Sequence, residues 1–394
     1  MTDVEELLRE TLSDPQRRIE PGPRMYETVR VRACKRRRRQ SAAIAASLAV
    51  VAIATAGSVV GVQRGGHRPA PASATHLTPA TSPALGTLGA KVSYGTTWEQ
   101  ATAVTIAPSG AIYVLTTNPT QVVLLAPTAN ESDGKYDVKG IEPGPSGLSS
   151  GMVVGSNTVW AYSADSGEIR EYDARTLAPL GVIQLGAAQI FQATALADEL
   201  WFTGSVDGKS GLHRLTAGST KPTLIPGVDA SAYGVAADPA RNRILVGVSS
   251  DAASFAGTRV ESVDASTLKI EKGGTAAVGK ESIAVVYDDV WLAGYGSGDS
   301  PRVVHFDAAS LQPIGTTAFN DQVGPGAEVV AGMNNVWVQA GGDAWAACLD
   351  PSSGRVLEIW ENGFDRLPAS AGGEALGIVG GEVTHLNLAG GCFG

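Results

Sequence analysis

One phrase recurs along the chain and constrains its fold more than any other feature. An aromatic or apolar strand is followed by a loop with an aspartate, a second strand and a polar turn. The clearest copy has Trp291, then Asp299, then the apolar run from Val303 to Asp307. With Tyr113 counted as an early copy, the anchor residues stand at positions 113, 160, 201, 245, 291 and 337.

Strand patterns repeated at this spacing are typical of the blades of a β-propeller. In the best-defined copy we expect four strands, over residues 282–287, 290–295, 302–306 and 313–318. The sequence therefore predicts an all-β propeller over residues 88–394. We expect seven blades, the last completed by a strand at 87–94 from the N-terminal side, and a six-bladed ring is the alternative.

The segment 41–62 contains no charged residue. At 1.5 Å per residue, a helix of this length spans about 33 Å, enough for a bilayer core of about 30 Å. Arg36, Arg37, Arg38 and Arg39 precede it directly. The positive-inside rule then predicts a single-pass protein of the cell membrane, with a cytoplasmic N-terminus and the propeller outside. A cleaved signal peptide, with Ala54-Thr55-Ala56 as its processing site, is the alternative.

The remaining N-terminal segments differ from the propeller in charge and composition. Residues 1–40 form a basic leader with eleven Lys/Arg against seven Asp/Glu, although the whole chain has a net charge of −9. Residues 3–13 have the pattern of an amphipathic helix, which we expect either to lie on the membrane or to bind a cytoplasmic protein. The Arg cluster favours anionic lipid, so nucleic acid is not an expected partner. Residues 63–87 are rich in Pro, Ala, Ser and Thr, which predicts an extended stalk.

Aspartates recur in the loop between the second and third predicted strands. The chain of a propeller enters every blade at one face, called the top face here, and this loop returns to it. The set is Asp165, Asp207, Asp251, Asp299 and Asp343. We expect an outer ring on the top face, with turn-stabilising aspartates as the alternative reading.

A second polar set is expected to head the inner strands, at the top mouth of the central channel. It consists of Gln100, Gln192, Glu281, Glu328 and Glu374. Carboxylates near one axis repel each other unless a cation or a basic ligand offsets their charge. The predicted partner of the top face is therefore a cation, with Ca²⁺ as the candidate, or a basic ligand or protein.

Other residues have structural interpretations. We expect Asp173, Asp264, Asp307 and Asp350 to stabilise turns on the opposite face, and the tryptophans of the repeat to pack between blades. Cys348 and Cys392 belong to the extracytoplasmic part, where oxidising conditions favour a disulfide between them. The five histidines have no zinc-ligand or catalytic spacing, so catalysis is not predicted.

The repeat period and the apolar-Asp-x-x-[Ser/Thr] turn resemble those of the YVTN/NHL/quinoprotein-like bacterial β-propellers, over residues 88–394. The leader, with Glu-Leu-Leu-Arg-Glu, a Pro-Gly break and the Arg cluster, resembles those of membrane proteins linked to extracytoplasmic-function sigma factors. The leading functional interpretation is an extracytoplasmic propeller that binds or senses a ligand, with a leader that either transmits the signal inward or only anchors the protein. A membrane-tethered enzyme of lactonase or lyase type, with a metal at the channel mouth, is the alternative function.

Overall fold

The computed structural model describes part of the chain, chiefly the repeat region. The described residues are 84–85, 87–91, 100–107, 109–117, 119–127, 136–147, 150–249, 257–295, 301–318, 327–331, 335–340, 346–360, 364–371 and 374–387. The predicted leader, membrane helix and most of the stalk lie outside these ranges. Within the ranges, no helix is long and apolar enough to cross a membrane.

The described strands form seven sheets, which we call blades 1 to 7 and which are antiparallel apart from one added strand. Blade 1 contains β3 (Gln100–Ile106), β4 (Ile112–Thr117), β5 (Gln121–Pro127) and β6 (Tyr136–Pro143). Blade 2 contains β7 (Ser150–Val154), β8 (Thr158–Ser163), β9 (Glu168–Asp173) and β10 (Pro179–Gln184). Blade 3 contains β11 (Ala188–Leu196), β12 (Glu199–Val206), β13 (Lys209–Thr216) and β14 (Thr223–Leu224).

The next blades follow the same order. Blade 4 contains β15 (Ala232–Asp238), a 3₁₀ turn at Pro239–Arg241, β16 (Arg243–Ser249), β17 (Thr258–Asp264) and β18 (Ile270–Ala276). Blade 5 contains β19 (Gly279–Val286), β20 (Asp289–Tyr295), β21 (Pro301–Asp307) and β22 (Pro313–Ala318). Blade 6 contains β23 (Ala327–Ala331), β24 (Val336–Ala340), β25 (Ala346–Leu349) and β26 (Val356–Trp360), with β1 (Ala84–Leu85) added in parallel to β26. Blade 7 contains β27 (Phe364–Ala371), β28 (Glu374–Val379), β29 (Glu382–Asn387) and β2 (Thr87–Lys91).

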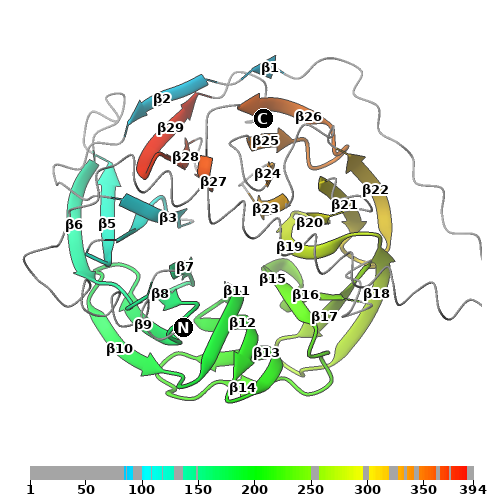
Figure 1. Cartoon of the computed structure of the whole chain (residues 1–394), viewed down its shortest axis with the longest axis horizontal. Helices are drawn as coiled ribbons and strands as arrows, with labels where there is room; N and C mark the ends of the chain where they lie inside the picture. Colours follow the sequence, from blue (N-terminus) through cyan, green and yellow to red (C-terminus); the bar gives the residue numbers. More distant parts are fainter. Residues whose placement is uncertain are drawn as a thin grey trace, which may run out of the picture. The chain divides into compact units, whose positions relative to one another are not determined.

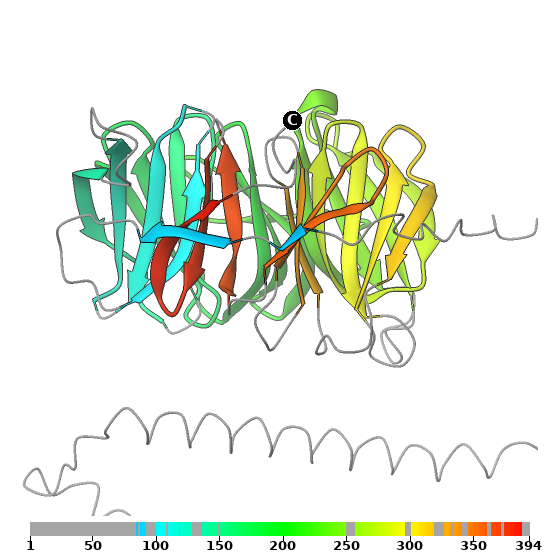
Figure 2. The ribbon, with the colours of Figure 1, turned by 90° about the horizontal axis from the view of Figure 1, so that it is seen from above.

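The seven sheets surround a common centre, and the first strand of each lies nearest to it (Figure 1). The strands run between two faces of the ring (Figure 2). The inner strands begin at the top face, and the hairpins between first and second strands lie at the bottom face. Blade 7 contacts blade 1 through β27 and β3, so the ring is closed. The prediction of an all-β propeller is confirmed.

Blade 7 combines strands from both ends of the repeat region. β2 pairs antiparallel with β29, and Leu88 lies opposite Leu386. This confirms that an N-terminal strand completes the last sheet. Residues 376–392 have the pattern of only two strands, whereas the chain contributes three C-terminal strands to this sheet. The additional strand is β27, which has the register irregularities of a poorly patterned segment on both sides of Arg366.

The core consists of apolar clusters between neighbouring blades. Trp160 of blade 2 packs with Leu200 and Phe202 of blade 3, and Trp291 of blade 5 packs with Val336 of blade 6. Four anchor tryptophans of the second strands are fully buried: Trp160, Trp201, Trp291 and Trp337. Their predicted role in packing between blades is confirmed, and burial of such rings contributes about 1.5–3 kcal/mol each.

Candidate functional site

The top mouth is formed by the first residues of the inner strands. Gln100 is the first residue of β3 and Glu328 the second residue of β23, and both are exposed. Glu281 is the third residue of β19, and its side chain lies outside the described part. The structure therefore places three of the predicted residues near the beginnings of inner strands.

Strand register shows that the predicted residues do not form one flat ring. Gln192 lies opposite Thr203, two residues before Thr194, which is the strand partner of Trp201. Glu328 lies opposite Gln339, two residues before Val330, which is the strand partner of Trp337. Gln100 lies opposite Thr117, closer to the end of its strand. Gln192 and Glu328 thus share a level, with Gln100 above them.

Gln192 has a structural partner in the next blade. Its side-chain carbonyl accepts a hydrogen bond from the backbone N–H of Val235 at 3.2 Å. Ser282 occupies the equivalent level of blade 5, and its hydroxyl accepts from the backbone N–H of Val329 at 2.5 Å. These bonds satisfy inner-strand amides that neighbouring sheets leave unpaired. Glu328 is at the same level but remains exposed.

The placement of Glu374 at the top mouth was wrong. Glu374 is the first residue of β28, the second strand of blade 7, and pairs with Ala371 at the end of the inner strand β27. A second strand begins at the bottom face, so Glu374 belongs to the opposite end of the ring. The error arose because the sequence pattern did not reveal β27 as a strand.

An aromatic pair that the sequence did not indicate joins two neighbouring inner strands. Phe191 of β11 and Tyr233 of β15 stack with ring centroids 5.1 Å apart and planes at 16°. Tyr233 is 38% exposed, unlike the buried anchor rings. The hydroxyl of Thr203 donates to the carbonyl oxygen of Tyr233, which fixes the backbone beneath the ring.

The outer ring of aspartates is only partly described. Asp165 and Asp207 are exposed in loops between second and third strands, as predicted. Asp207 and Gly208 have φ values of 50° and 75° and form a two-residue hairpin between Val206 and Lys209. Such an Asp-Gly turn explains Asp207 by backbone conformation alone. Three members lie outside the described residues: Asp251, Asp299 and Asp343.

The bottom face carries the third set of aspartates, each at the end of a third strand. In every case one carboxylate oxygen accepts hydrogen bonds from a backbone N–H and a hydroxyl two or three residues further along the chain. The pairs are Asp173–Thr176, Asp264–Thr267, Asp307–Ser310 and Asp350–Ser352. These bonds lower the pKa of each aspartate below its usual value, although burial opposes the shift at Asp350. The structural interpretation of this set is supported.

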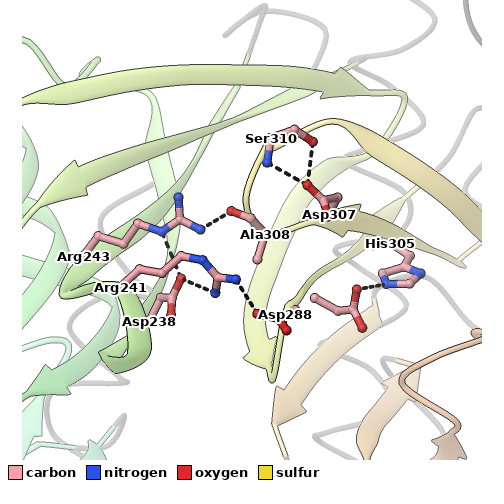
Figure 3. Close-up of polar contacts among 9 residues, drawn as sticks. Asp238, Arg241, Arg243, Asp288, His305, Asp307, Ala308 and Ser310 are labelled. Atoms are coloured by element: carbon pink, nitrogen blue, oxygen red, sulfur yellow. Dashed lines mark hydrogen bonds and ion pairs between the residues drawn. The ribbon is translucent and has the colours of Figure 1, made fainter.

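A polar cluster lies at the bottom of the seam between blades 4 and 5 (Figure 3). Arg243 donates to the buried carboxylate of Asp238 at 2.9 Å and to the carbonyl oxygen of Ala308. Arg241 contacts Asp238 at 3.4 Å and also pairs with Asp288. The two arginines make the contacts across the seam, Arg241 to Asp288 and Arg243 to Ala308, so the cluster joins two blades.

The described histidines also have structural surroundings. His213 is buried against Phe202, and burial lowers its pKa. His305 pairs with Asp289 at 2.8 Å. Among the described residues, no three His, Cys, Asp or Glu side chains lie together as a metal-binding group.

The predicted disulfide involves a residue outside the described part, Cys392. Cys348 is buried on β25, in one cluster with Trp337, Ala375 and Leu386. Leu386 belongs to β29 of blade 7 and precedes Cys392 by six residues. This arrangement is compatible with a bond that joins the C-terminus to blade 6, and the pairing stays a prediction.

Comparison with known proteins identifies relatives by fold only. No protein-family model and no curated protein sequence matches the chain. The streptogramin B lyase structure superposes with a TM-score of 0.54 at 12% identity, covering 76% of this chain and 97% of the lyase. The β-propeller domain of Cps50 (Swd1) from Myceliophteria thermophila gives a TM-score of 0.54 at 12% identity, covering 74% and 97%. At this identity, the chain is shown to share the β-propeller fold with both proteins.

Proposed function

We propose that this protein is a membrane-anchored, extracytoplasmic propeller that binds a cationic ligand or a basic partner at its top mouth. The observation that carries the proposal is the contrast between the two faces. The bottom-face aspartates use their carboxylates in turns. On the inner strands, by contrast, the side chains of Gln100 and Glu328 are exposed, and no contact of either carboxylate or amide group with a turn is seen among the described residues.

Electrostatics favour a positively charged ligand at this mouth. After the leader and the apolar segment, residues 64–394 contain 19 Lys/Arg against 32 Asp/Glu. A concave mouth with acidic side chains raises the local concentration of cations. Glu281, the third residue of the inner strand β19 in blade 5, is the other glutamate of the predicted set on a neighbouring strand.

The proposed anchor is the uncharged segment 41–62, with Arg36 to Arg39 against anionic lipid on the cytoplasmic side. Residues 3–13 would then dock on a cytoplasmic protein and transmit ligand binding inward. The support for this part is the sequence pattern and the resemblance of the leader. Carbonate extraction of membranes that contain the full chain tests the anchor, because an integral protein stays in the pellet and a peripheral one is released.

Thermal unfolding of the full chain tests the binding role. Three cations serve as probes: Ca²⁺, penta-lysine and choline. We expect at least one to raise Tm, since a ligand that binds only the folded state stabilises it by about 2.7 kcal/mol at a concentration of 100 Kd. Glu281→Ala and Glu328→Ala should abolish the shift, whereas Glu271→Gln on the outer strand β18 should retain it. If none of the probes shifts Tm, the proposed preference for cations is wrong.

The second candidate function is an enzyme of lactonase or lyase type with a metal at the mouth, and it has a separate support. That support is the likeness in fold to streptogramin B lyase, which carries no activity by itself. Metal-dependent opening of a lactone, lost in Glu328→Gln, would favour the enzyme over the binding module.

A further inference from the structure

We infer that residues 72–78, upstream of β1, add a further strand to the outer edge of β22 in blade 5. The inference is independent of the ligand role proposed above and concerns how the propeller is joined to the N-terminal part of the chain. Three observations carry it: the strands that the N-terminal side already adds to the propeller, an uncharged open edge next to them, and an uncharged, proline-free segment upstream.

The N-terminal side of the propeller already supplies strands to two blades. β1 pairs in parallel with β26 of blade 6, β2 pairs antiparallel with β29 of blade 7, and only Gly86 separates the two strands. Both lie on the outer circumference, one after the other (Figure 1). Followed towards its N-terminus, the chain therefore passes from blade 7 to blade 6, and blade 5 presents the next outer edge in this direction.

The register of β1 directs the upstream chain to that edge. Ala84 lies beside Glu358 of β26 in a parallel pairing. A strand continued backwards in this register would reach the level of Gly354 at residue 80. The carbonyl oxygen of Gly354 accepts a hydrogen bond from the hydroxyl of Thr317 on β22 at 2.9 Å. The path along β26 thus ends where blade 6 touches the outer strand of blade 5.

The outer edge of β22 is suited to accept another strand. β22 (Pro313–Ala318) contains no charged residue, and among the described strands it pairs only with β21. The side chain of Ile314 is 52% exposed. Charged side chains protect the outer strands β6 and β18, and β14 has only two residues. An uncharged edge of this length pairs readily with a further strand unless it is covered.

β10 of blade 2 is a second uncharged outer strand, and it provides a comparison. Its Leu180 and Val182 are 58% and 57% exposed. Blade 2 is not a neighbour of blade 6, so the chain that enters β1 is not directed towards it. The same kind of edge therefore exists at a place that the upstream segment does not approach.

The upstream segment has the composition of an added strand. Residues 72–78 read Ala-Ser-Ala-Thr-His-Leu-Thr and contain no Asp, Glu, Lys or Arg, so no charge opposes contact with β22. Pro71 and Pro79 flank the segment and limit the pairing to it, because proline has no N–H to donate. At about 3.3 Å per residue the segment extends about 23 Å, enough to cover β22.

Docking of this segment shortens the free linker. The stalk predicted over residues 63–87 would be mobile only over residues 63–71, between the proposed anchor and the propeller. A linker of this length reaches at most about 30 Å. The added strand would also cover the last long uncharged edge on this side of the ring, next to the edges that β1 and β2 already cover.

Hydrogen–deuterium exchange of the full chain in maltoside micelles, measured by mass spectrometry, tests the inference. In the wild type, amides of residues 72–78 should exchange at least about tenfold more slowly than those of an unstructured peptide. Ile314→Lys places a charge on the edge of β22 and should accelerate this exchange by about tenfold. Thr75→Pro/His76→Pro removes two adjacent donors, one on each side of the added strand, and should accelerate exchange of the β22 amides by about tenfold.

Each change has a matched control. Val182→Lys adds the same charge to the uncharged edge of β10, and Gly65→Pro/Gly66→Pro adds the same two prolines upstream of the segment. Neither control should alter the exchange of residues 72–78 or of β22. Exchange of the second strand β20, unchanged in every variant, verifies that the variants fold.

Three results would overturn the inference. The first is exchange of residues 72–78 in the wild type at the rate of an unstructured peptide. The second is acceleration by Val182→Lys in place of Ile314→Lys, which would put the segment on blade 2. The third is a dimer in light scattering that Thr75→Pro/His76→Pro dissociates, which would put the segment on a second copy of the chain. None of these results involves a cation, so the proposed ligand role stands or falls separately.

Discussion

The imidazole of His305 lies flat on the indole of Trp291, with ring centroids 4.2 Å apart and planes at 6°. The two residues face each other across β20 and β21, and a carboxylate oxygen of Asp289 lies 2.8 Å from Nε2 of the imidazole. Blade 3 repeats the arrangement, because Arg214 lies over Trp201 and pairs with Glu199. An acid, a base and a tryptophan thus form one unit at equivalent positions of two blades.

Removal of the His305 side chain should destabilise the propeller. His305→Ala leaves a cavity against Trp291 and deprives Asp289 of its partner. We expect the free energy of unfolding to fall by about 2 kcal/mol, as measured by urea denaturation. His305→Phe, which keeps the stack and loses the contact with Asp289, should lie between the alanine variant and the wild type. A loss below about 0.5 kcal/mol in His305→Ala would show that the stack contributes little.

His213 should make stability depend on pH. Burial against Phe202 lowers its pKa in the folded protein, whereas an unfolded histidine titrates near pH 6.5. The unfolded state therefore binds more protons below that value, so stability is fully present above about pH 6.5 and decreases as the pH falls towards the folded pKa. His213→Gln should show a smaller drop in Tm between about pH 7.5 and 5.5 than the wild type. An identical drop in both proteins would contradict the assignment.

The strands β1 and β2 should stabilise blades 6 and 7 from the N-terminal side. They cover the outer edges of β26 and β29, which would otherwise be exposed. A chain that begins at residue 92 should lose about 2 kcal/mol, or about 4 °C in Tm, relative to a chain that begins at residue 80. The comparison is a calorimetric one, and equal Tm values would show that the two strands are dispensable.

The pairing of Cys348 with Cys392 leads to a simple thiol count. Of the three cysteines, only Cys34 should react with a thiol reagent when the intact protein is denatured without reductant. Reduction should lower the free energy of unfolding by about 2–4 kcal/mol, because the bond restricts the unfolded chain. Three reactive thiols would exclude the bond.

The sequence was sufficient for the repeat, the buried tryptophans and the aspartate turns. Each of these depends on residues close together in the chain, so the pattern repeats with the blades. The Asp307–Ser310 turn is an example, since its hydrogen bonds span three residues. Hydrogen bonds between residues this close in the chain can be predicted from the sequence alone.

Features that depend on contacts between blades were not predictable in this way. The stack of Phe191 on Tyr233 joins two inner strands, and the bond from Val235 to Gln192 depends on register shifts in both strands. The sequence did not predict β27 as a strand, because a segment that contains Arg366 and Pro368 lacks the apolar run seen in β19. Glu374 was misplaced as a consequence.

Fluorine NMR of the full chain labelled with 3-fluorotyrosine tests the central claim most directly. The chain has nine tyrosines, and the Tyr233 and Tyr287 resonances can be assigned from the variants Tyr233→Phe and Tyr287→Phe. On titration with the probe cation that raises Tm, the resonance of Tyr233, near the beginning of the inner strand β15, should shift to saturation while that of Tyr287, on the bottom face, stays in place. A Tyr233 resonance that does not move while the cation binds would contradict a ligand site at the top mouth.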